Sequence, residues 1–166
     1  MDQIALEKIF AESFEAYSDA IFRFCMVKVS NVELAEDFTQ EVFTRYWQTL
    51  RKGTEMTNTR AYLYTIAHNM AKDWYKKKKS ISLETHLETG LDPSTYTTST
   101  SEQHSEYRKV IDEIEDMEDS DKLVLLLKYV EGLDPKDIAL ILGESANTVS
   151  VRLHRAITKL QTRLHV

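Results

Sequence analysis

Residues 125–160 read LLLKYVEGLDPKDIALILGESANTVSVRLHRAITKL. The stretch begins with a run that is too apolar all round for a surface helix, which predicts the buried centre of a small bundle. Gly132 and Gly143 are typical helix ends, and the DP pair between them predicts the start of a short helix. Ser145 or Asn147 is expected to cap a last helix. The stretch therefore predicts consecutive helices and no strand.

The last two of these helices have the spacing of a helix-turn-helix. Ala139 is small enough for a second helix to cross it closely, Gly143 permits a left-handed turn, and Val149 seats the second helix. The second helix of such a motif enters the major groove of DNA. Residues 147–166 include basic side chains and no acidic one. The alternative is a plain helical hairpin with a solvated basic face. The predicted outward stripe consists of Thr148, Arg152, Arg155 and Lys159.

The first part of the chain also has helical periodicity. Apolar residues recur at helical spacing over residues 4–29, with a break expected near Ser18. The S-x-x-E pattern that begins at Ser30 predicts the start of a second helix, which runs to about residue 50. Asn58 or Thr59 is expected to cap a third helix that runs to about residue 79.

Residues 81–104 differ in character from the rest. They contain acidic side chains, no lysine or arginine, and no apolar periodicity. This composition predicts a flexible polar linker, which could span at most ~80 Å. The predicted fold class is therefore all-α, with two small helical domains at residues 1–80 and 105–166 joined by a flexible linker.

The bulk composition narrows the class of protein. A single cysteine, Cys25, excludes an internal disulfide and fits a reducing compartment such as the cytoplasm. No apolar run approaches the ~18 residues of a membrane span, so membrane insertion is not expected. The formal net charge of −6 argues against strong DNA binding by the free protein, because affinity for phosphate depends on basic residues.

A polar stripe follows one face of the second predicted helix. Its acceptors could dock onto a basic helix of a partner, and the alternative is a merely solvated face. Asp37 and Glu41 also have the i,i+4 spacing of a metal pair, but no third ligand joins them, so neither a metal nor another cofactor is expected. The stripe consists of Asp37, Gln40, Glu41, Thr44 and Gln48.

One face of the third predicted helix combines aromatic, amide and basic groups. Such groups suit single-stranded or melted nucleic acid, whose bases stack and present their edges. The alternative is a helix whose lysine-rich end complements its dipole. The face consists of Tyr62, Thr65, Asn69, Lys72 and Lys76.

At this point the motifs resemble a known family. LAEDFTQEVFTRYW (residues 34–47) followed by TRAYLYTIAHNMAKDWYKKKK (residues 59–79) resembles the second conserved region of sigma factors, and residues 125–160 resemble the fourth. Because it lacks a third conserved region between these two, the chain resembles the extracytoplasmic-function group of the sigma-70 family. The resemblance implies a bacterial, cytoplasmic transcription initiation factor, not an enzyme, that directs RNA polymerase to the −10 and −35 elements of promoters and supports DNA melting.

The resemblance also implies roles for individual residues. A flipped base of the −10 element would lie near Asn69, with Thr49 and Ile66 lining its pocket and the loop at residues 51–59 helping to capture it. The residues expected to contact the polymerase core are Asp37, Gln40, Glu41 and Phe43. Those expected along the −10 strand are Lys72, Asp73 and Lys76. Those expected to read the −35 element are Thr148, Ser150, Val151, His154 and Arg155, beside Arg152 and Lys159 of the outward stripe.

The implied partners are the RNA polymerase core, through its β′ clamp helices and β flap, promoter DNA, and an anti-sigma factor. The chain departs from the family pattern at Ser150, where lysine or arginine is common, and at Val151, where a small polar residue is common. Both departures predict an unusual −35 preference. The rival interpretations are a stand-alone helix-turn-helix regulator and a metal-dependent nuclease.

Overall fold

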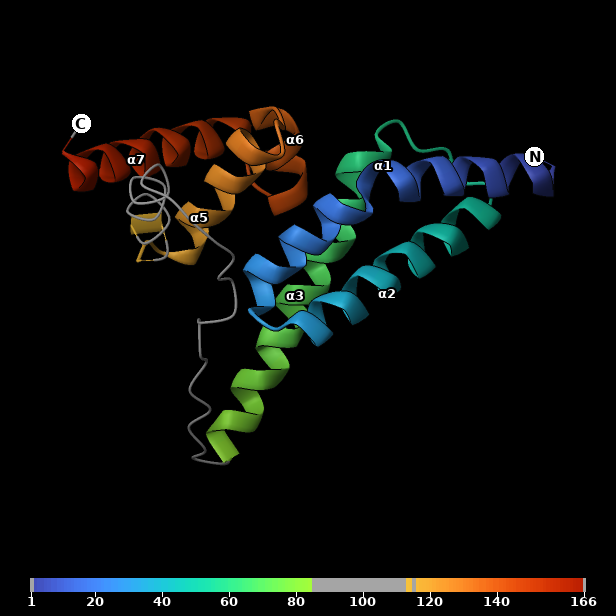
Figure 1. Cartoon of the computed structure of the whole chain (residues 1–166), viewed down its shortest axis with the longest axis horizontal. Helices are drawn as coiled ribbons and strands as arrows, with labels where there is room; N and C mark the ends of the chain where they lie inside the picture. Colours follow the sequence, from blue (N-terminus) through green and yellow to red (C-terminus); the bar gives the residue numbers. More distant parts are fainter. Residues whose placement is uncertain (1, 85–112, 115, 166) are drawn as a thin grey trace, which may run out of the picture. The chain divides into compact units, whose positions relative to one another are not determined.

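The computed structural model describes residues 2–84, 113–114 and 116–165 of a chain that folds into two compact units, Met1–Leu91 and Asp92–Val166. Throughout those described ranges the regular elements are helices and no strand occurs, which confirms the predicted all-α class (Figure 1). Within the same ranges, no helix is long and apolar enough to cross a membrane.

The first unit is built from three helices, α1 (Gln3–Val29), α2 (Val32–Arg51) and α3 (Thr59–Glu84). A tight turn joins α1 to α2, and the cap predicted at Ser30 is wrong. Ser30 adopts the left-handed conformation (φ 50°) that ends α1, and the side chain of Asn31 accepts the Leu34 N–H at 2.8 Å instead. The amide oxygen of asparagine caps as well as a serine hydroxyl does, so the start of α2 moves by one residue only.

Two further boundaries differ from the prediction. Helix α1 is not broken near Ser18; it is one continuous ribbon that bends in its middle, as expected where a long helix wraps around a core (Figure 1). Helix α3 is capped by Asn58, whose side chain accepts the Ala61 N–H at 2.9 Å, and it continues to Glu84. Residues 81–84 of the predicted linker are thus helical, and residues 85–104 lie outside the described residues.

The core of the first unit combines aromatic and small apolar side chains from all three helices. Tyr46 is fully buried, and its hydroxyl lies 2.8 Å from the hydroxyl of Ser13, so a polar bridge joins α1 to α2 inside the core. Phe24 meets Tyr64 edge-to-face at 5.4 Å between ring centroids. Burial raises the pKa of the Cys25 thiol to about 11, which keeps it neutral and packed as a small apolar group.

In the second unit, the predicted apolar run is helical. Its residues form α5 (Asp119–Leu125) and a π-helical turn, η1 (Leu126–Val130). The wider turn ends where the N–H of Leu133 donates to the carbonyl of Leu127, around Gly132 at φ 65°. Two more helices follow, α6 (Pro135–Leu142) and α7 (Ala146–Leu164).

The junction of α6 and α7 has the geometry that the spacing predicted. Ala139 and Val149 are both buried, and Gly143 between them has φ 67°, which is left-handed and favours glycine. Ser145 caps α7 by accepting the Thr148 N–H at 3.1 Å. The two helices are therefore set as a helix-turn-helix.

An ion pair fixes α7 to α5. The Nζ of Lys159 lies 2.6 Å from Oδ2 of Asp121, a carboxylate that is only 5% exposed. The hydrogen bond to Asp121 raises the pKa of Lys159 above its ordinary value. Because the carboxylate is buried, it depends on this one lysine for charge compensation among the described residues.

We expect Tyr46→Phe to lower the free energy of unfolding of the first unit by about 1–3 kcal/mol, because the buried Ser13 hydroxyl loses its partner. Tyr17→Phe is the matched control, since Tyr17 is only half-buried on α1. Urea unfolding of the full chain measures both variants. Equal stability of the two would show that the bridge inside the core contributes nothing.

We expect Lys159→Met to lower the melting temperature of the second unit, because it leaves the Asp121 carboxylate buried without its cation. Adding Asp121→Asn should restore part of the loss, and Lys136→Met, at an exposed lysine of α6, should have little effect. On the alkaline side, the raised pKa of Lys159 means that the contribution of the pair is kept up to about pH 10.5 and is lost as the pH rises through the raised value. A Lys159→Met chain as stable as the parent at pH 7 would contradict this account.

Candidate functional site

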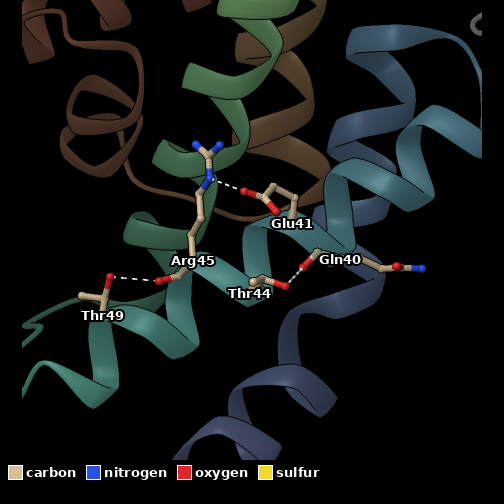
Figure 2. Close-up of polar contacts among 5 residues, drawn as sticks. All are labelled: Gln40, Glu41, Thr44, Arg45 and Thr49. Atoms are coloured by element: carbon tan, nitrogen blue, oxygen red, sulfur yellow. Dashed lines mark hydrogen bonds and ion pairs between the residues drawn. The ribbon is translucent and has the colours of Figure 1, made fainter.

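The polar stripe of α2 lies at the surface of the first unit. Asp37, Gln40 and Thr44 are exposed, and Glu41 is half-buried at its base. Figure 2 shows the Gln40 side chain extending from the helix with its amide pointing away from the neighbouring residues. The stripe is therefore available to a partner along its length.

Contacts within α2 hold part of this stripe in place. The Nε of Arg45 donates to Glu41 at 2.7 Å, one helical turn away, and the Thr44 hydroxyl donates to the Gln40 carbonyl at 2.9 Å (Figure 2). Such an exposed pair adds little stability, so its effect is to orient the carboxylate. No group of three potential metal ligands is brought together in the described ranges.

Phe43 lies beneath the stripe. It was expected to contact the polymerase, but it is only 2% exposed. Its ring meets Phe14 at 4.8 Å and Phe10 at 6.1 Å between centroids, both edge-to-face. Phe43 therefore supports the surface from below, and the aromatic side chain that reaches solvent is Phe14, which is 47% exposed.

An apolar hollow runs beside the stripe, between α1 and α2. It has a volume of about 550 Å³, and we call it the aromatic groove. Its lining residues are Glu7, Phe10, Phe14, Gln40, Phe43, Thr44 and Trp47. The groove shares Gln40 and Thr44 with the stripe, so the two form one continuous surface. The sequence alone did not indicate it, because its wall combines three residues of α1 with four of α2. The i,i+4 spacing of Phe10 and Phe14 was the available signal.

The residues expected around the flipped base come together on one face. The Thr49 hydroxyl of α2 lies 2.9 Å from the Tyr62 hydroxyl of α3. Ile66 and Asn69 follow Tyr62 at i+4 and i+7, which places them on the same side of α3. Ile66 is half-buried and Asn69 is exposed, so the amide projects beyond an apolar wall.

A basic pocket lies further along α3. Its volume is about 330 Å³, and its lining residues are Lys28, His68, Lys72, Tyr75, Lys76 and Lys79. Lys72 and Lys76 were expected along the −10 strand, whereas Lys28 comes from the end of α1. The Tyr75 hydroxyl donates to the Lys28 carbonyl and ties the two helices together. Asp73 is exposed on α3 and is not among the lining residues.

Four of the residues expected to read the −35 element have partners within their own unit. The Thr148 hydroxyl lies 2.8 Å from that of Ser145, and the Ser150 hydroxyl donates to the Ala146 carbonyl at 2.9 Å. Arg152 pairs with Glu144 at 2.9 Å. Lys159 is the fourth, through its bond to the buried carboxylate of α5 described above.

The remaining three expected residues share one exposed face of α7. Val151, His154 and Arg155 stand at i, i+3 and i+4, so their side chains are neighbours on the helix surface. All three are exposed. The exposed surface of α7 therefore combines one apolar, one imidazole and one guanidinium group with the exposed side chains of Thr148, Ser150 and Lys159.

Comparison with known proteins matches both units to parts of one family. Residues 13–81 match Sigma-70 region 2, and residues 107–160 match Sigma-70, region 4. Two relatives come from Bacillus subtilis. RNA polymerase sigma factor YlaC is 26% identical over 168 residues, covering 96% of this chain and 92% of the relative. ECF RNA polymerase sigma factor SigW is 26% identical over 169 residues, covering 93% and 88%.

Two solved structures share the fold. The sigma factor RpoE of Bartonella quintana, solved in complex with the anti-sigma factor NepR, has a TM-score of 0.74 and 22% identity, covering 96% of this chain and 98% of that chain. CnrH, solved in complex with the cytosolic domain of CnrY, has a TM-score of 0.66 and 19% identity, covering 96% and 89%. Because two sigma-70 regions match in order along the chain and the relatives match over nearly their whole length, the chain belongs to the sigma-70 family of RNA polymerase sigma factors, in its extracytoplasmic-function group.

Proposed function

We propose that the first unit docks on the RNA polymerase core and engages the −10 element, while the second unit reads the −35 element. The observation that carries this proposal is the continuous surface of the α2 stripe and the aromatic groove. A regulator that binds DNA by itself needs no such docking surface. The stand-alone helix-turn-helix regulator is therefore the less favoured reading.

The chemistry of this surface indicates which kind of partner it binds. Asp37, Gln40 and Glu41 offer oxygen acceptors along one line, which complement lysine or arginine side chains of a helix. The adjoining groove offers aromatic rings to an apolar side chain of the same helix. We assign this surface to the β′ clamp helices, and the residues at its edge that complete the contact are Phe14 and Trp47.

The face of α3 is suited to melted DNA. Extrusion of a base from the stack costs a few kcal/mol, which hydrogen bonds to its edge and apolar contact can offset. Asn69 supplies donor and acceptor groups, and Ile66 supplies the apolar wall. The basic pocket from Lys28 to Lys79 would hold the phosphates of the same strand.

Net charge explains why the two units depend on the polymerase. The chain carries −6, and three of the cations on α7, Arg152, Lys159 and Arg163, are paired with carboxylates of their own unit. Free protein should therefore bind duplex promoter weakly and gain affinity when the polymerase positions both units. The domain limits that we propose are residues 1–84 and 105–166, with residues 85–104 as the linker; the first limit moves from the predicted residue 80 to the end of α3.

Regulation by a protein that binds over these surfaces fits the proposed function. RpoE was solved with an anti-sigma factor bound. An anti-sigma factor of this chain would occupy the same surfaces that the polymerase and the promoter use, including a site on the second unit for the β flap. The chain would act in the bacterial cytoplasm, where the polymerase and the promoter are.

We expect the double variant Asp37→Arg/Glu41→Arg to weaken binding to the purified polymerase core by about a hundredfold or more, because two acceptors become cations facing a basic helix. Fluorescence anisotropy of labelled protein titrated with core measures the effect. The matched control is Glu15→Arg/Asp19→Arg, the same change of charge at the same spacing on exposed residues of α1. Core binding that is equally tight in both double variants would rule out α2 as the docking helix.

We expect Asn69→Ala to lower the rate of open-complex formation by about tenfold, the effect of lost hydrogen bonds to one base edge. The measurement is 2-aminopurine fluorescence in the −10 region during initiation by reconstituted holoenzyme. Templates with single abasic positions in the non-template −10 strand locate the captured base.

At the captured position, the parent and Asn69→Ala should open the abasic template at the same rate, because the base that the amide contacts is missing. At the other positions they should keep their difference. A constant difference at every position would mean that Asn69 does not contact a base.

A further inference from the structure

Three polar side chains in the first turns of α7 form contacts within their own unit. The hydroxyls of Thr148 and Ser150 bond to the cap and to a backbone carbonyl, and the Arg152 guanidinium bonds to Glu144. Each of these contacts uses part of the hydrogen-bonding capacity of its group and limits the directions in which the remaining donors and acceptors can reach a base edge. An exposed apolar side chain on the same turns carries no such constraint.

Val151 is the large apolar side chain that α7 exposes. It is 42% exposed, although it is apolar and lies between hydroxyl and guanidinium neighbours. It is the sixth residue of α7, within the N-terminal part that contacts base edges in a helix-turn-helix. Its branched side chain is stiff, so little rotamer freedom is lost on contact.

We infer that Val151 determines specificity at the −35 element by packing against the 5-methyl group of a thymine. This inference rests on the proposed function of α7 as the −35 reader. In the major groove, thymine presents an apolar methyl group where cytosine presents hydrogen, and a valine that cannot form hydrogen bonds gains only from the methyl. The class of site is therefore an A·T pair with its thymine methyl directed at α7.

The neighbours of Val151 support this assignment. His154 and Arg155 lie one turn further along the same face and are exposed. Arg155 can bond a phosphate or a guanine edge, which would hold α7 in register while the valine contacts the methyl. The recognised surface is thus compact, with one apolar contact next to one cationic contact.

The test uses holoenzyme reconstituted from the full chain and polymerase core. A promoter is first selected from duplexes with a randomised −35 region. Each thymine of the selected element, on either strand, is then replaced by deoxyuracil, which removes the methyl group and keeps every hydrogen-bonding group. At one position we expect promoter affinity to fall about fourfold, the effect of one buried methyl group.

Val151→Ala should abolish the discrimination between thymine and deoxyuracil at that position. The control is Val32→Ala, an exposed valine of nearly equal exposure (43% against 42%) at the start of α2, which should leave the discrimination intact. A selected element without thymine, indifference to every deoxyuracil, or discrimination that survives Val151→Ala would overturn the inference while leaving the sigma-factor function intact. A holoenzyme that initiates on no selected promoter would overturn both.

Discussion

The contact between Lys159 and the buried carboxylate of Asp121 sets the rotation of α7, and the outward face of the second unit depends on it. A carboxylate that is almost completely removed from water needs a cation within hydrogen-bond distance, and α7 supplies it. Val149 of the same helix is fully buried, so α7 is held by an apolar and an ionic contact. Val151 and Arg155 are exposed on this helix, and the surface proposed to meet DNA is therefore carried by an element that the ion pair attaches to α5.

In the first unit, a buried hydrogen bond and aromatic packing hold α2 on α1. Tyr46 is buried across from Ser13, and this fixes how α2 lies on α1. The same packing turns Asp37 and Gln40 outward and opens the aromatic groove beside them. The groove is a by-product of how aromatic rings pack: edge-to-face contacts around Phe43 leave Phe14 only partly covered. A partner helix that covers Phe14 would form the apolar contacts that this side chain lacks within its own unit.

Most basic side chains near the end of the chain form ion pairs within the second unit, and few are left to bind DNA. The sequence shows four basic residues and no acid in the last twenty positions, which suggests a DNA-binding surface of high charge. In the fold, Arg152 and Lys159 each pair with a carboxylate of the same unit, and Arg163 pairs with Glu113 at 3.5 Å. Much of the apparent basicity therefore stabilises the unit. This division agrees with a protein that binds promoters only in company with a polymerase, because few cations remain to attract duplex DNA on their own.

The sequence by itself determined the helices, the helix-turn-helix and the family. These depend on local rules, such as the left-handed glycine at Gly143 and the helical spacing of apolar residues, and such rules operate within a few positions of the chain. The tertiary structure decided which of the candidate residues remain exposed and unpaired, so that they are available to a binding partner. Phe43 of α2 is buried against aromatic rings of α1, Arg152 of α7 pairs with Glu144 of the turn before it, and Lys28 of α1 lines the same pocket as Lys72 of α3. Helical periodicity assigns a residue to a face, but the partner that covers or neutralises that face is chosen by packing between helices.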